Sequence, residues 1–160
     1  MIDSDNGSHE FDWEIGAWDT AVRVLHNPLS TDATWVDYNG TSIVHALCGG
    51  GANVVELDVA GAAGRLRGVS LRLYHPAARQ WSLNFASMGD GLLTPPVIGG
   101  FSGRRGEFYG TDTVRGRAVL VRFVILDVMA DAARFEQSYS VDGGQTWELN
   151  WVAVDTRRPG

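Results

Sequence analysis

Apolar and polar residues alternate with a period of two in segment after segment of this chain, and turn-forming residues separate the segments. Such alternation sends successive side chains to opposite faces of a strand, whereas almost no segment shows the 3.6-residue repeat of an amphipathic helix. The pattern gives about nine or ten strands with short, mostly Gly-containing connections. It favours an antiparallel meander closed into an up-and-down barrel, because closure removes the exposed sheet edges. The sequence therefore predicts an all-β fold.

The predicted strands cover residues 17–26, 35–47, 54–59, 65–74, 80–87, 106–113, 118–128, 133–141 and 146–155. Residues 27–33 are expected to form a long loop that can lie over one end of the barrel as a lid. Residues 89–100 form a second irregular stretch, because Thr94-Pro95-Pro96 interrupts any ladder. Gly40 predicts a bulge or sharp bend inside the second strand.

The run 11–19, FDWEIGAWD, predicts a short N-terminal helical turn that leads through Gly16-x-Trp18 into the first strand. Gly16 lets the backbone turn tightly at the floor of the barrel, and Trp18 points toward the enclosed core. The same strand face carries Thr20, Val22, Val24 and His26. We expect the Trp18 ring to plug one end of the barrel.

A chain of 160 residues can bury a core without disulfides, so one domain is expected at 11–158, preceded by a flexible polar segment at 1–10. The net charge is -6, and all basic residues are Arg. This balance argues against nucleic-acid binding, and no apolar run approaches the ~20 residues of a membrane span. The start of the sequence lacks the features of a secretory signal, and Cys48 has no disulfide partner in the chain. A cytoplasmic protein is predicted.

Gly16-x-Trp18, the long meander, and Arg157 or Arg158 just after the last strand together resemble the lipocalin and calycin barrels. The resemblance implies that one of these Arg side chains stacks over Trp18. Nearly the whole chain is also similar to a calycin-like family of uncharacterised bacterial proteins, through FDWEIGAWD, GVSLRLYHPAARQWSLNFAS, GEFYGTDTVRGRAVLVRFVI and ARFEQSYSVDGGQTWELNW. That family implies a fold and no function. Asp19-Thr20-Ala21 replaces the glycine-rich opening of haem-binding calycins, so no haem or other cofactor is expected.

Residues 140–147, SVDGGQTW, match the Asp-box pattern S-x-D-x-G-x-T-W. In this motif the Asp caps the amides of a turn and the Trp packs beneath the hairpin. The motif occurs once, and the chain has no repeat of propeller length. We interpret it as a hairpin fastener without sugar chemistry, since an Asx turn followed by Gly is reason enough for these residues.

His9, His26, His45 and His75 show none of the spacings of a metal site, so no metal is predicted. His26 and His45 can each be a histidine of the core or rim, or an acid or base in catalysis. Arg122 interrupts the apolar strand VLVRFVIL and has two interpretations. It can point outward and bridge to Glu107 or Glu136, or point inward and grip an anionic ligand.

Aromatic residues at alternating positions of separate strands should meet inside the barrel, where they fill it or surround a cavity. We predict that the cavity binds a small, mostly apolar metabolite, neutral or anionic. The predicted ligand-binding residues are Trp18, His45, Trp81, Asn84, Phe85, Arg122, Tyr139 and Trp151. The alternative is a calycin-like cyclase or isomerase acting in the same cavity, with His26, His45, Glu136 or Tyr139 as acid or base. The sequence leaves the oligomeric state open, a homodimer included.

Overall fold

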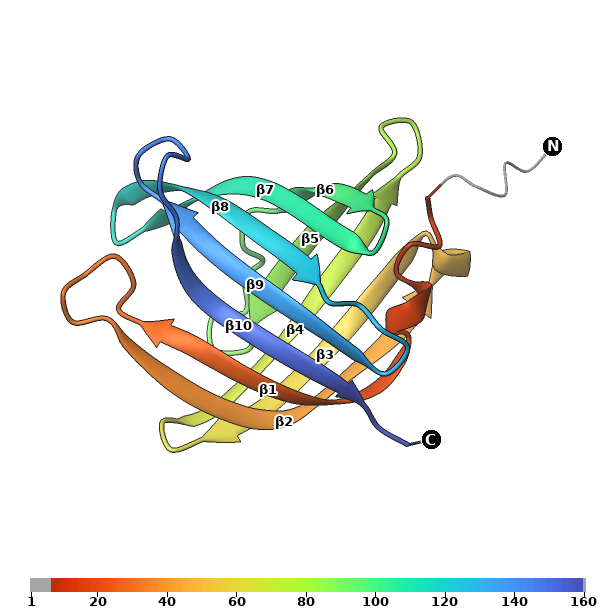
Figure 1. Cartoon of the computed structure of the whole chain (residues 1–160), viewed down its shortest axis with the longest axis horizontal. Coiled ribbons are helices and arrows are strands. Elements are labelled where there is room, and N and C mark those ends of the chain that lie inside the picture. The colour runs from red at the N-terminus through yellow and green to blue at the C-terminus, as the bar shows by residue number, and fades with distance from the viewer. Residues whose placement is uncertain (1–6, 160) are drawn as a thin grey trace.

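The computed structural model describes residues 7–159, which form a closed barrel of antiparallel strands (Figure 1). The strands are β1 (Gly16–His26), β2 (Thr34–Leu47), β3 (Ala52–Gly61), β4 (Gly64–His75), β5 (Gln80–Ser87), β6 (Val97–Ser102), β7 (Arg105–Val114), β8 (Arg117–Leu126), β9 (Ala132–Ser140) and β10 (Glu148–Arg157). Each strand pairs with the next, and β10 closes the barrel on β1. The all-β up-and-down barrel is confirmed, with two short helical turns, η1 (Asp12–Glu14) and η2 (Cys48–Gly50).

Two local predictions differ from the structure. The irregular stretch 89–100 ends earlier than expected, because residues from Val97 onward form β6 against β5 and β7. Gly40 causes no bulge, since the register of β2 with β1 and β3 continues through it. A Cβ at Gly40 would lie 2.1 Å from the Asp58 carbonyl oxygen, so this glycine allows β3 to approach closely. Of the predicted segment 1–10, residues 1–6 lie outside the described residues.

The N-terminal turn closes one end of the barrel, on the right in Figure 1, and the β1–β2 and β9–β10 connections lie at the opposite end. Phe11, which precedes η1, is 1% exposed and meets the Trp81 and Phe101 rings edge-on at centroid distances of 4.8 and 5.0 Å. Trp13 stacks on Phe135 with centroids 6.4 Å apart. The turn is therefore an internal plug that contacts several strands.

Trp18 is fully buried beneath this plug, as the Gly-x-Trp pattern predicts. Its indole Nε1 donates a hydrogen bond to the Glu14 carbonyl oxygen at 2.8 Å. The Arg157 guanidinium lies 4.1 Å from the Trp18 ring and donates to the carbonyl oxygens of Trp13 and Ile15. Arg157 is thus the stacking arginine that the lipocalin resemblance implies, and it joins the last strand to the first turn.

Gly16 leaves the room that this contact needs. It has a φ of +125°, and a Cβ there would lie 2.9 Å from Arg157 Nη1. A larger residue would be strained by its backbone conformation and would crowd the guanidinium. The Gly-x-Trp pattern and the C-terminal arginine therefore form a single packing unit.

The Asp-box residues fasten the β9–β10 hairpin. Asp142 accepts hydrogen bonds from the Thr146 backbone N–H at 2.9 Å and from the Thr146 and Ser140 hydroxyls at 2.6 and 2.7 Å. These bonds hold the pKa of Asp142 down, at about 2. The predicted fastener is confirmed.

Among the described residues, no helix is long and apolar enough to cross a membrane.

Replacing Trp18 with Ala should lower the free energy of unfolding by about 3–5 kcal/mol, because the fully buried ring would leave a cavity at the closed end. Urea unfolding of both proteins measures the difference. Trp35→Ala is the matched control, since Trp35 is only half-buried and lies on the outer face beside Arg23. Equal losses in the two variants would contradict the role given to Trp18.

Candidate functional site

A cavity of about 330 Å³ lies inside the barrel above the plug. It reaches the surface beside the loop at 88–96, because the exposed residues Thr94 and Pro95 belong to its lining. Of the two predicted lid loops, this one therefore borders the cavity. The loop at 27–33 contributes no residue to the described lining, and its Leu29 N–H donates to the Glu148 carboxylate at 2.8 Å.

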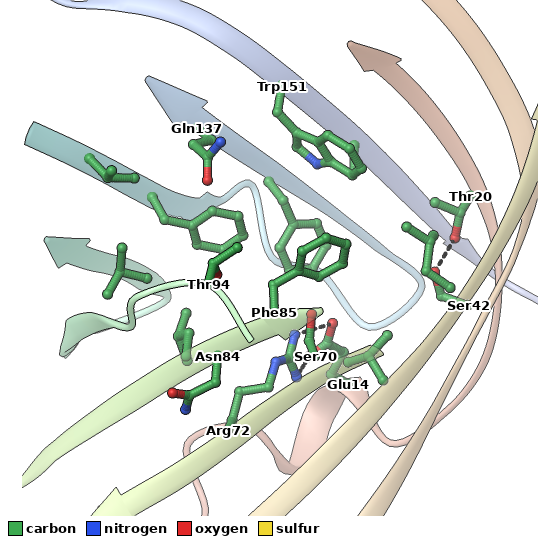
Figure 2. A pocket seen from close by; sticks show the side chains of 18 of the residues that line it. Glu14, Thr20, Ser42, Ser70, Arg72, Asn84, Phe85, Thr94, Gln137 and Trp151 are labelled. Atoms are coloured by element: carbon green, nitrogen blue, oxygen red, sulfur yellow. Dashed lines mark hydrogen bonds and ion pairs between the residues drawn. The ribbon is translucent and has the colours of Figure 1, made fainter. Parts of the chain in front are cut away.

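The walls of the cavity are mainly apolar. Strands on opposite sides contribute Leu57, Leu83, Phe85, Val97, Val121, Phe123, Phe135, Trp151 and Ala153. Figure 2 shows Phe85 and Trp151 reaching toward the centre from β5 and β10. Five aromatic rings, those of Phe85, Phe123, Phe135, Tyr139 and Trp151, thus border one space, which suits a flat apolar molecule.

The floor is polar and contains a buried ion pair. Arg72 Nη1 donates to Glu14 Oε2 at 2.5 Å, and Nη2 donates to Glu14 Oε1 at 3.2 Å (Figure 2). Arg72 Nη1 also donates to Asn53 Oδ1 at 2.8 Å. The side chains of Arg72 and Glu14 are 6% and 2% exposed. Arg72 also lies 4.6 Å from the Phe11 ring. Glu14 belongs to the N-terminal turn, so this pair fixes the plug to β4.

A second polar group lies beside the floor. The Thr20 hydroxyl donates to Asp155 Oδ1 at 2.6 Å and lies 2.7 Å from the Ser42 hydroxyl. Because the single Thr20 proton goes to Asp155, the Ser42 hydroxyl is the donor to Thr20. The chain of bonds therefore runs from β2 through β1 to β10 and ends at a carboxyl that lines the cavity.

Asp155 has an unusual protonation equilibrium. Burial raises the pKa of its carboxyl to about 7, with a further increase from the Glu14 charge. The Thr20 hydrogen bond and the Arg72 charge oppose the increase without cancelling it. Near neutral pH the cavity therefore contains a carboxyl that can gain or lose a proton, which is the property of a general acid or base.

Several predicted ligand-binding residues are brought together here. Asn84, Phe85, Tyr139 and Trp151 belong to the lining. The Asn84 amide, however, donates to the Leu71 carbonyl on the neighbouring strand. Burial raises the pKa of the Tyr139 hydroxyl, with help from the charge of Asp112. Trp18 and Trp81 are fully buried around the plug and do not belong to the lining.

Other predicted site residues lie outside the cavity lining. Arg122 points outward, opposite to its lining neighbours Val121 and Phe123, and its guanidinium sits 4.4 Å from the Trp147 ring. His45 is exposed, on the face of β2 opposite to the buried Val44. Glu136 is ion-paired with Arg134 at 2.8 Å outside the cavity.

His26 is at the end of β1, where its Nε2 lies 3.1 Å from the Tyr38 hydroxyl. It is exposed and does not belong to the lining.

The residues of the polar floor escaped the sequence analysis. In GVSLRLYH the apolar Val69, Leu71 and Leu73 alternate with Ser70 and Arg72, and the usual interpretation places the apolar set inside. The structure shows the reverse, since Ser70 and Arg72 line the cavity while Leu73 is 43% exposed. The signal that the sequence offers is a Glu in the aromatic and acidic turn 11–14 together with an Arg inside a later strand. No group of three metal-ligating side chains occurs among residues 7–159.

Asp155→Asn should change how stability depends on pH. The pKa of Asp155 lies near 7 in the folded protein and has its ordinary value of 3.8 in the unfolded chain, so between these values the folded protein keeps a proton that the unfolded chain has released. The free energy of unfolding of the wild type therefore falls across this interval. As pH rises from about 4 to about 7.5, the free energy of unfolding of Asp155→Asn should therefore increase by up to about 4 kcal/mol relative to that of wild type.

Urea unfolding of both proteins across that interval measures the gain. The Asn amide oxygen can still accept the Thr20 hydrogen bond, which keeps the comparison close. Asp142→Asn is the control, since the lowered pKa of Asp142 leaves its carboxyl ionised in both states above about pH 5. A difference in the free energy of unfolding between wild type and Asp155→Asn that stays constant with pH would contradict the raised pKa of Asp155.

Comparison with solved structures supports the fold. No family model matches the chain, and no curated protein matches it. The S-type phycobiliprotein lyase CPES from Guillardia theta is similar over 100% of this chain and 99% of that chain, with a TM-score of 0.62 and 9% identity. EF1p2_mFAP2b bound to DFHBI is similar over 95% of this chain and 99% of that chain, with a TM-score of 0.51 and 7% identity. At such identities the likeness shows the fold alone, a lipocalin-like barrel.

Proposed function

We propose that this protein binds a small, mostly apolar molecule inside the barrel. The observation that carries the proposal is the cavity of about 330 Å³, which combines aromatic walls with a polar floor and reaches the surface beside Thr94 and Pro95. Small-molecule sites share this makeup, and their volumes begin at about 300 Å³. The ligand is therefore small and buries most of its surface.

Two further points support the proposal. The barrel has ten strands, and barrels of about eight strands are already just wide enough for side chains to fill. The N-terminal turn fills the additional interior space of the ten-stranded barrel at one end only. One of the similar barrels, EF1p2_mFAP2b, is also bound to DFHBI, and another is a phycobiliprotein lyase. The cytoplasmic location and the homodimer stay predictions from the sequence.

Filling the cavity with a large side chain should weaken ligand binding. Ser70 lines the cavity from β4, so Ser70→Trp puts an indole into the space of the ligand. Arg67→Trp adds the same ring at an exposed position of the same strand and is the control. The probe is N-phenyl-1-naphthylamine, a neutral dye whose fluorescence increases in apolar surroundings.

Wild type and Arg67→Trp should enhance the dye fluorescence with the same dissociation constant, whereas Ser70→Trp should weaken binding at least ~10-fold. Thermal melts confirm that each variant is folded. Unchanged dye binding by a folded Ser70→Trp would place the dye elsewhere and overturn the proposal.

A second candidate is acid–base catalysis in the same cavity, and Asp155 is the observation that favours it. Of the four acid–base residues predicted from the sequence, Tyr139 alone lines the cavity. Asp155 is the better base, because burial brings the pKa of its carboxyl to about 7 inside an apolar enclosure. An isomerase that moves a proton on a small hydrophobic substrate would need such a group.

The test uses 5-nitrobenzisoxazole, a small flat compound that opens when a base removes its ring C–H proton and the N–O bond breaks to give a phenolate. If Asp155 acts as a base, the rate should rise with pH through about 7 and fall at least ~10-fold in Asp155→Asn. The phenolate absorbance follows the reaction. Equal rates in both proteins would exclude Asp155 as the base and leave binding as the function.

A further inference from the structure

The cavity lining carries more acidic than basic side chains. Among the described lining residues, Glu14, Asp112 and Asp155 are acidic, and Arg72 is the one basic residue. Arg72 is already neutralised by Glu14, to which both of its terminal nitrogens donate. It also donates to Asn53 and lies against the Phe11 ring. A ligand carboxylate would therefore meet a paired arginine and two further acidic groups.

Asp155 has acceptor capacity that the protein does not use. Its side chain is buried, and Oδ1 accepts the Thr20 hydrogen bond. Its Oδ2 accepts no hydrogen bond from residues 7–159, and Asp155 forms no ion pair with them. An ionised carboxylate can accept about four hydrogen bonds, so most of this capacity faces the cavity. A buried carboxylate in this state gains strongly from a cationic or hydrogen-bond-donating partner.

The aromatic walls favour the same kind of partner. Phe85, Phe123, Phe135 and Trp151 line the same cavity as Asp155. The faces of aromatic rings attract cations, more strongly where water is excluded. The carboxylate of Asp155 and the aromatic rings together favour a ligand with an ammonium group on an apolar body and disfavour an anionic ligand.

We propose that the ligand is a small apolar amine, whose protonated nitrogen pairs with Asp155 while its apolar part packs against the aromatic walls. This inference rests on the proposed function and gives its ligand a chemical class. It replaces the anionic ligand that the sequence allows if Arg122 points inward, because Arg122 points outward.

The charged groups around Asp155 set how binding depends on pH. Glu14 and Arg72 act on Asp155 from the floor, Asp112 lines the cavity from β7, and Thr20 and Ser42 are the uncharged neighbours on β1 and β2. On the same strand, Arg157 is directed to Trp18. Because the pKa of Asp155 is about 7, its carboxyl is protonated at lower pH and loses its attraction for an ammonium group. Amine binding should weaken as pH falls below about 7.

The experiment compares three naphthalene compounds that share one ring system: 1-naphthalenemethylamine, 1-naphthalenemethanol and 1-naphthoate. At about pH 8, calorimetry should show the amine binding at least ~10-fold tighter than the alcohol, and the carboxylate binding more weakly than the alcohol. At about pH 5.5 the preference for the amine should fall several-fold. In Asp155→Asn, amine and alcohol should bind within ~2-fold of each other at both pH values, while Asp112→Asn should keep the preference.

Each other outcome has a distinct meaning. Binding of the alcohol with no preference for the amine, or with the carboxylate tightest, overturns the amine inference and leaves the proposed function standing. Loss of the preference in Asp112→Asn, with Asp155→Asn unaffected, overturns the assignment to Asp155. Failure of all three compounds to bind, together with failure of N-phenyl-1-naphthylamine, overturns the proposed function itself. Thermal melts of Asp155→Asn and Asp112→Asn show that both variants are folded under the conditions of the binding measurements.

Discussion

The buried ion pair between Arg72 and Glu14 is the constraint on which the interior of this barrel depends. Taking two charges out of water costs several kcal/mol, and only close geometry with further hydrogen bonds offsets that cost. Here the guanidinium has two bonds to Glu14, one to Asn53 and a ring beneath it. Because Glu14 can reach Arg72 only when the N-terminal turn is inside the barrel, the pair fixes the position of the plug. The plug in turn separates a packed closed end from a cavity.

Barrel size explains why both a plug and a cavity exist. A closed barrel of ten strands encloses more volume than side chains on its inner face readily fill. At the closed end, Phe11 and Trp13 from the turn add rings to those of Trp18 and Trp81. Beyond the turn the interior stays open as the cavity, which the loop at 88–96 borders through Thr94 and Pro95. The cavity is thus a consequence of where the inserted turn stops.

The fold could be predicted from the sequence because it rests on local patterns. Alternation gives the strands, Gly16-x-Trp18 marks the closed end, and SVDGGQTW identifies one hairpin. The site could not be predicted in the same way, because its key contacts join residues far apart in the chain, such as Glu14 with Arg72 and Thr20 with Asp155. Arg122 shows why a single strand misleads. Both faces of β8 are apolar around it, and it points outward because the barrel turns its neighbours Val121 and Phe123 inward. The β9–β10 hairpin then brings Trp147 over its guanidinium.

The inverted faces of β4 connect the fold to the chemistry. Turning Ser70 and Arg72 inward while leaving Leu73 exposed is unfavourable for packing, so the arrangement depends on the polar contacts that it makes inside. Those contacts account for Arg72, which makes three hydrogen bonds to Glu14 and Asn53, but they leave Asp155 with a single hydroxyl donor. Proteins tend to tolerate such incomplete compensation at functional sites. A carboxyl that the fold holds without its own counter-ion, at the edge of an apolar cavity, is therefore most simply explained by a partner that comes from outside the chain.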